Sequence, residues 1–105
     1  MRQKKVEHRV ASVDALKEGE SLLVEVGGQR IAVFRHDGEF FAVDDECPHK
    51  GGSLHEGPVQ DGIVSCPWHQ WQFDVRTGIS PVNHLSTIKA YSTRVKGRDL
   101  LVVLE

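Results

Sequence analysis

Two short segments of this chain carry the residue types that hold transition metals. Its only two cysteines, Cys47 and Cys66, are each followed closely by a histidine, at His49 and His69. The spacings are Cys-x-His and Cys-x-x-His, and sixteen residues separate His49 from Cys66. Thiolate and imidazole together suit zinc and iron–sulfur centres. These four residues are therefore the candidate metal ligands.

The residues between and after these ligands are those that bend a chain sharply. A proline follows each cysteine, at Pro48 and Pro67, and the pair Gly51-Gly52 follows the first histidine. Proline fixes φ in advance and glycine accepts φ > 0. We expect two tight loops, each of which turns a cysteine and a histidine towards the same metal.

The order of the ligands distinguishes between the possible metals. Zinc fingers pair cysteine with cysteine and histidine with histidine, whereas each loop here mixes one of each. The mixed pattern favours a Rieske [2Fe-2S] cluster, in which two histidines replace two cysteines on one iron. A zinc site and a set of unliganded residues are the alternatives. An electron spin resonance spectrum separates these readings, because zinc is silent.

At this point the chain resembles a known family. Residues 44–78 contain the strings CPHKGGSL and CPWHQWQFD and a following TG. This pattern is similar to that of small Rieske ferredoxins and of the Rieske-type small subunit of nitrite reductases. The resemblance implies that Cys47 and Cys66 bind an inner iron, while His49 and His69 bind an outer iron near the surface. Respiratory-chain members have an additional cysteine in each loop. Gly52 and Trp68 occupy those positions here, which argues against a respiratory subunit.

Composition limits the remaining possibilities. The chain has 105 residues, is 39% hydrophobic and has a net charge of −2, which fits one globular domain and gives no electrostatic case for binding nucleic acid. It has no apolar run of transmembrane length and no apolar stretch near the N-terminus that would form a signal peptide. We expect no membrane association and a cytoplasmic protein whose thiols are available for metal.

The remaining pattern predicts an all-β fold, a Rieske-type antiparallel sandwich or barrel. Short apolar stretches alternate with Gly-containing turns, as in sandwiches and barrels. We expect one domain over residues 1–105, with a cluster-binding subdomain at about 45–78 inserted in a β scaffold formed by 1–44 and 79–105. The predicted strands cover residues 5–10, 21–26, 29–35, 39–44, 62–66, 71–75, 86–96 and 100–104, with a helical turn within 12–18.

Other residues that could carry chemistry have simpler interpretations. Four further histidines stand in polar contexts and are expected to be solvated. They are His8, His36, His55 and His84. The tryptophans Trp68 and Trp71 are expected to shield the cluster and fill the core beside it. Because neighbouring strand residues point to opposite faces, one of Phe40 and Phe41 should face outward.

These observations predict an electron-transfer component with no substrate site of its own. The expected role is a soluble one-electron carrier, a monomer that docks transiently with a flavin-dependent reductase and a terminal oxygenase. The alternative is a small subunit or electron relay of a nitrite reductase. Respiratory members donate hydroxyl hydrogen bonds from positions occupied here by Trp71 and Phe73. The lack of those hydroxyls predicts a potential near the bottom of the Rieske range.

Overall fold

The computed structural model describes residues 6–47, 52–67, 71–83 and 85–104. Nine strands and two single 3-10 turns follow one another along these residues. The strands are β1 (Val6–Ser12), β2 (Ser21–Val26), β3 (Gln29–His36), β4 (Glu39–Asp44), β5 (Val59–Gln60), β6 (Ile63–Ser65), β7 (Gln72–Asp74), β8 (Ala90–Lys96) and β9 (Asp99–Leu104), and the turns are η1 (Val13–Ala15) and η2 (Leu54–Glu56).

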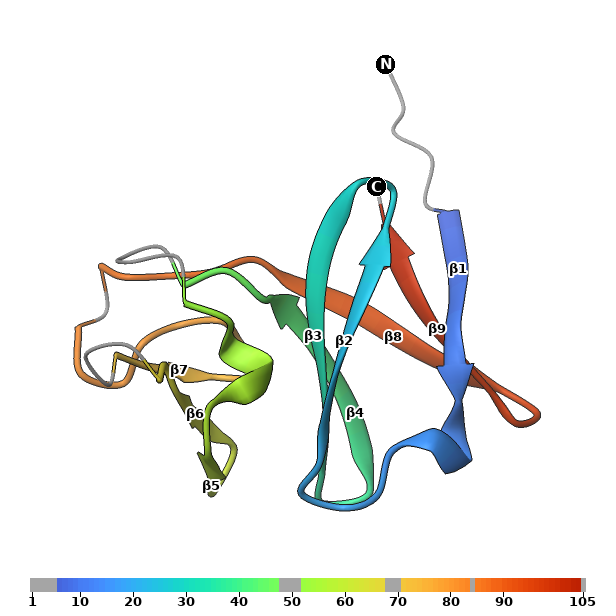
Figure 1. The fold of residues 1–105 in the computed structure, drawn as a ribbon, viewed down its shortest axis with the longest axis horizontal. Coiled ribbons are helices and arrows are strands. Elements are labelled where there is room, and N and C mark those ends of the chain that lie inside the picture. The colour runs from blue at the N-terminus through green and yellow to red at the C-terminus, as the bar shows by residue number, and fades with distance from the viewer. Residues whose placement is uncertain (1–5, 48–51, 68–70, 84, 105) are drawn as a thin grey trace.

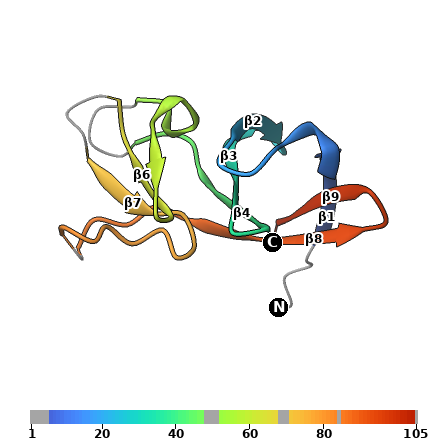
Figure 2. The same cartoon turned by 90° about the horizontal axis from the view of Figure 1, so that it is seen from below.

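The strands form two antiparallel sheets that lie side by side (Figures 1 and 2). The large sheet has the order β1-β9-β8-β4-β3-β2 and curls into a nearly closed barrel. A surface hollow lined by His8–Val10 of β1, Leu23–Val26 of β2 and the following Gly27 marks the seam between its two edges. The small sheet has the order β5-β6-β7. The predicted all-β fold is confirmed.

Strands β3 and β4 are buried on both faces, because each serves two cores. In β3, Ile31 and Val33 point into the barrel core, which is formed by Leu16, Val26, Ile31, Val33, Ala42, Tyr91, Leu100 and Val102. Their neighbours Ala32 and Phe34 point the other way, into the junction core between the two sheets. The junction core consists of Ala32, Phe34, Val43, Cys47, Leu54, Val64, Cys66, Phe73, Val75 and Ile88. Period-two alternation thus makes these strands the wall between the two cores.

The prediction that one of Phe40 and Phe41 faces outward is wrong. Phe40 packs against the barrel core and Phe41 against the junction core, and both rings are half-buried. The guanidinium of Arg35 lies 5.2 Å from the centre of the Phe40 ring, within cation–π range. The sequence prediction failed because it assumed that only one face of the strand would be covered.

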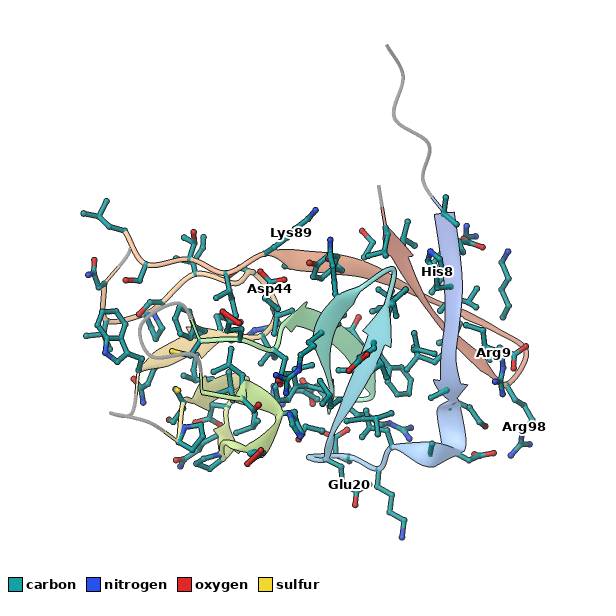
Figure 3. The ribbon with its side chains drawn as sticks, turned by 45° about the horizontal axis from the view of Figure 1, so that its top comes forward. His8, Arg9, Glu20, Asp44, Lys89 and Arg98 are labelled. Carbon is teal, nitrogen blue, oxygen red and sulfur yellow. The ribbon has the colours of Figure 1, made fainter. Side chains whose placement is uncertain are left out.

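The chain returns from the small sheet to the barrel where β4 meets β8. Figure 3 labels Asp44 and Lys89 at this junction. The Asp44 amide donates to the Lys89 carbonyl at 2.9 Å, and the Lys89 amide donates to Asp44 Oδ2 at 3.1 Å. The Tyr91 hydroxyl donates to Asp44 Oδ1 at 2.6 Å. Burial and the nearby Asp44 carboxylate raise the pKa of Tyr91, so its hydroxyl remains a donor at neutral pH.

The ends of the described chain meet in the barrel. Val6 pairs with Leu104 in the β1–β9 ladder, and both ends lie away from the small sheet (Figure 1). Most strand predictions are confirmed, and those for β2 and β4 match their bounds. Strand β5 and turn η2 were not predicted. Within the described residues, no helix is long and apolar enough to span a membrane.

Candidate metal centre

The first candidate loop leaves the barrel at the end of β4 and closes through backbone contacts. The Cys47 amide donates to the Gly52 carbonyl at 2.8 Å, and Glu46 forms an isolated β-bridge with Ser53. Further from the loop tip, the Leu54 amide donates to the Asp45 carbonyl at 2.7 Å. These contacts bring the two arms of the loop together, and we refer to residues 45–47 and 52–55 as the first neck.

The second candidate loop is carried by a β-hairpin. Cys66 directly follows β6, and its amide donates to the carbonyl of Trp71 at 2.6 Å. Below this bond, Ser65 pairs with Gln72, Val64 with Phe73 and Ile63 with Asp74. The ladder between β6 and β7 therefore holds the two arms of this loop in register.

Both cysteines lie in the junction core. Each is 1% exposed, and they belong to the same apolar cluster as Leu54, Val64 and Phe73. Neither cysteine forms a disulfide. Two thiols at the bases of neighbouring loops, buried without a disulfide, fit the inner half of a two-iron site. His49 and His69 lie outside the described residues, so their predicted role stays a prediction.

The two loops are joined by a close backbone approach at Gly57. This residue follows the first neck, and a Cβ built on it would lie 1.9 Å from the carbonyl oxygen of Ser65, next to Cys66. The Ser65 amide also donates to the Pro58 carbonyl at 3.0 Å. Only glycine fits at this contact. The structure thereby couples the segment carrying Cys47 to the segment carrying Cys66.

A buried acidic residue in the first neck was not predicted. The Asp45 side chain is fully buried, and its Oδ1 lies 2.8 Å from Nδ1 of His55. The prediction that His55 is merely solvated is wrong, because its side chain is only 23% exposed and contacts this carboxylate. In the sequence, Asp45 stands in the acidic run DDE and resembles a solvated charge.

The remaining sequence candidates divide between this end of the molecule and the barrel. Trp71 is half-buried and packs against the junction core, as expected of a residue that fills it. His8 and His36 are half-buried on β1 and β3 of the barrel. Trp68 and His84 lie outside the described residues.

Comparison with known proteins identifies the family. The model of the Rieske [2Fe-2S] domain matches residues 6–103. The chain belongs to the Rieske [2Fe-2S] domain family. Its cofactor is accordingly a Rieske-type [2Fe-2S] cluster, as the ligand spacing predicted. The chain is 43% identical over 96 residues to the biphenyl dioxygenase ferredoxin subunit of Pseudomonas sp. strain KKS102, an alignment covering 90% of this Rieske chain and 88% of the relative.

Solved structures share this Rieske fold. A chain from the complex of reduced oxygenase and oxidized ferredoxin in carbazole 1,9a-dioxygenase matches with a TM-score of 0.85 and 28% identity, covering 94% of this chain and 97% of that one. A protein described as an NADH-dependent nitrite reductase small subunit from Mycobacterium tuberculosis matches with a TM-score of 0.91 and 23% identity, covering 98% of each chain. At that identity the second likeness shows the fold alone.

Replacing Gly57 by alanine tests the coupling between the two candidate loops. The new Cβ would overlap the Ser65 carbonyl, so one segment must move. We expect Gly57→Ala to lower the free energy of unfolding in denaturant by more than about 3 kcal/mol. Gly57 has φ of −84°, which alanine adopts freely, so the loss would come from the overlap alone.

The matched control for this substitution is Gly38→Ala. Gly38 has φ of +77° and open space around its Cα, so an added Cβ causes backbone strain without overlap. We expect a loss of about 1 kcal/mol. Equal losses in the two variants would show that the contact between Gly57 and Ser65 does not hold the loops together.

Proposed function

We propose that this Rieske protein is a soluble one-electron carrier of the cytoplasm, which takes electrons from a flavin-dependent reductase and passes them to a terminal oxygenase. The observation that carries the proposal is the pair of buried thiols, Cys47 and Cys66, on coupled loops. The likeness to the biphenyl dioxygenase ferredoxin subunit, at 43% identity, supports the oxygenase as the electron acceptor.

The proposed ligands are Cys47, His49, Cys66 and His69. The two cysteines would hold one iron from within the junction core, and the two histidines would hold the other iron. Bound in this way, the cluster supplies a one-electron redox couple. The backbone amides of Cys47 and Cys66 donate to the carbonyls of Gly52 and Trp71, and their buried thiolates would bind iron. We further propose that residues 45–78 form a cluster-binding subdomain of a single domain.

A nitrite reductase small subunit is the second candidate function, and the TM-score of 0.91 favours it only at the level of the fold. The two roles differ in how the protein associates with its partner. A subunit remains bound to a large reductase during gel filtration, whereas a carrier elutes alone and is reduced reversibly by a separate reductase. The higher sequence identity to an oxygenase ferredoxin favours the carrier.

The ligand set and the carrier role can be tested together. After anaerobic reconstitution with iron and sulfide, the protein should give a Rieske electron spin resonance spectrum and transfer electrons from a flavin reductase charged with NAD(P)H to an oxygenase. Cys66→Ser and His69→Cys should abolish both properties, because each replaces one of the four ligands of the Rieske set by another group. His8→Gln, on β1 of the barrel, should change neither. A reconstituted wild-type protein that stays colourless would disprove the ligand assignment.

Exposed apolar side chains on the segment after β7 favour a docking surface at the small-sheet end. Val82 is 77% exposed and Leu85 is 94% exposed, and Figures 1 and 2 place residues 79–87 (orange) beside the small sheet. Ser80 is buried, and its Oγ accepts from the amides of Val82 and Asn83 at 3.2 Å. The segment is thus shaped by polar contacts while its apolar side chains face outward. An apolar projection of this kind suits a transient protein contact.

Substitution of Leu85 tests this docking surface. If Leu85 is buried against the oxygenase, Leu85→Ser should raise the carrier concentration needed for half-maximal turnover by about fivefold, the effect of losing about 1 kcal/mol. Val95 is 50% exposed on β8 of the barrel, so Val95→Ser is the control and should have no effect. Equal effects of the two substitutions would place the docking surface elsewhere.

We also propose that the potential is low, near the bottom of the Rieske range. Hydrogen bonds to the sulfurs raise the potential of such centres, and the backbone amides of both cysteines already donate to the carbonyls of Gly52 and Trp71. Phe73 is fully buried in the junction core with the two cysteines and has no hydroxyl to donate. The extra electron of the reduced state is therefore weakly stabilised.

A redox titration measures this potential. We expect a midpoint of about −150 to −50 mV, within a Rieske range of about −150 to +300 mV. Trp71→Ser with Phe73→Tyr should raise it by supplying hydroxyl donors. Phe40→Tyr, which adds a hydroxyl to a ring that packs against the barrel core instead, is the control and should change it little. A wild-type value above about +150 mV would refute the hydrogen-bond argument.

A further inference from the structure

The two ligand loops are closed in different ways. The second loop stands on the ladder between β6 and β7, in which three residue pairs are in register. The first neck has no such ladder within the residues that the structure describes, only the isolated bridge between Glu46 and Ser53 and single backbone bonds. Something other than strand pairing must therefore fix how the arm carrying Cys47 lies against the returning arm.

The Asp45 side chain supplies a second connection across the first neck. Its Oδ1 accepts from the backbone amide of His55 at 2.9 Å and lies 2.8 Å from Nδ1 of the same residue. Because a carboxylate oxygen can only accept, the imidazole donates through Nδ1. Asp45 Oδ1, on the arm that leaves β4, thus binds both the backbone amide and the ring of His55, on the arm that returns from the loop.

The barrel anchors the same pair of residues. Ser21 of β2 donates its hydroxyl to the His55 carbonyl at 2.5 Å, and the Asp45 amide donates to the Arg30 carbonyl of β3 at 3.1 Å. The Arg30 guanidinium lies 3.4 Å from Asp45 Oδ2 and donates to Ser53 at 3.1 Å. The two arms of the first neck are thereby bonded to each other, through Asp45 and His55, and to strands β2 and β3 of the barrel.

The energetics of Asp45 favour a role in geometry over one in stability. Its side chain is fully buried, and Oδ2 has no hydrogen-bond partner among the described residues. Burying a carboxylate is costly, and an apolar side chain of similar size often stabilises a protein as well or better. A charged group at such a position favours the arrangement that brings its partners to it, here His55 at Oδ1 and the Arg30 guanidinium near Oδ2.

We propose that Asp45 and His55 are positioning residues for the first ligand loop. Their contact sets the orientation in which Cys47 is presented to the cluster, and so influences both cluster retention and the electronic environment of the irons. The proposal rests on the ligand assignment made under Proposed function. It concerns two residues that do not themselves bind iron.

A matched pair of substitutions at His55 tests this role in the cluster-loaded protein. Asparagine places an amide N–H where imidazole Nδ1 lies, whereas glutamine places it near Nε2, away from Asp45. We expect His55→Gln to lose the cluster to an iron chelator about tenfold faster than wild type, as the loss of a bond to a charged group implies. Its electron spin resonance g-values and midpoint potential should shift as well. His55→Asn should restore the wild-type spectrum and retention within about threefold.

His8→Gln, on β1, is the control for the same chemical change and should behave as wild type. If His55→Gln does not fold, Asp45→Asn removes the charge at nearly constant volume and should produce the same faster loss and spectral shift. Identical behaviour of His55→Gln and His55→Asn would overturn the proposal, as would wild-type spectra in both His55→Gln and Asp45→Asn. A wild-type protein without a Rieske spectrum would overturn the ligand assignment, and with it this inference.

Discussion

The structure depends on two strands that are buried on both faces. Alternate residues of β3 and β4 fill the barrel on one side and support the two cysteines on the other, so Val33 and Phe34 serve different cores. A strand in this position must be apolar at nearly every residue, and the run IAVF at 31–34 meets that condition. Through this wall, the three-stranded small sheet shares the junction core with the barrel.

Beyond this wall, the end that carries Cys47 and Cys66 combines two ways of holding a loop. The second loop relies on the backbone pairing of β6 with β7, which needs no particular side chains. The first loop relies on side chains, with Asp45 contacting His55 and Gly57 lying against Ser65. The backbone contact at Gly57 joins the two loops, so the positions of Cys47 and Cys66 are not independent.

The sequence predicted the parts of the molecule that are governed by local rules. The cysteine and histidine spacing identified the cofactor, and the turn residues between apolar stretches placed β2 and β4 at their observed bounds. It did not predict β5, because two residues are too few to show an alternating pattern. It also misjudged His55, since the burial of its partner Asp45 depends on packing against a strand distant in sequence. Phe40 and Phe41 were misjudged because the prediction assumed one covered face, although the run FFAV at 40–43 is apolar at every residue, as a strand buried on both faces requires.

The pairing of Val6 with Leu104 has a consequence for how this domain can be linked to other proteins. Both ends of the described chain emerge from the barrel at one place, away from the small sheet (Figure 1). A reductase or oxygenase fused at either end would be tethered without covering the metal-binding face. Such a tether raises the effective concentration of the partner, so that each electron transfer no longer requires a free encounter in solution. The domain could also be inserted into a loop of a host protein, because its two ends span a short distance.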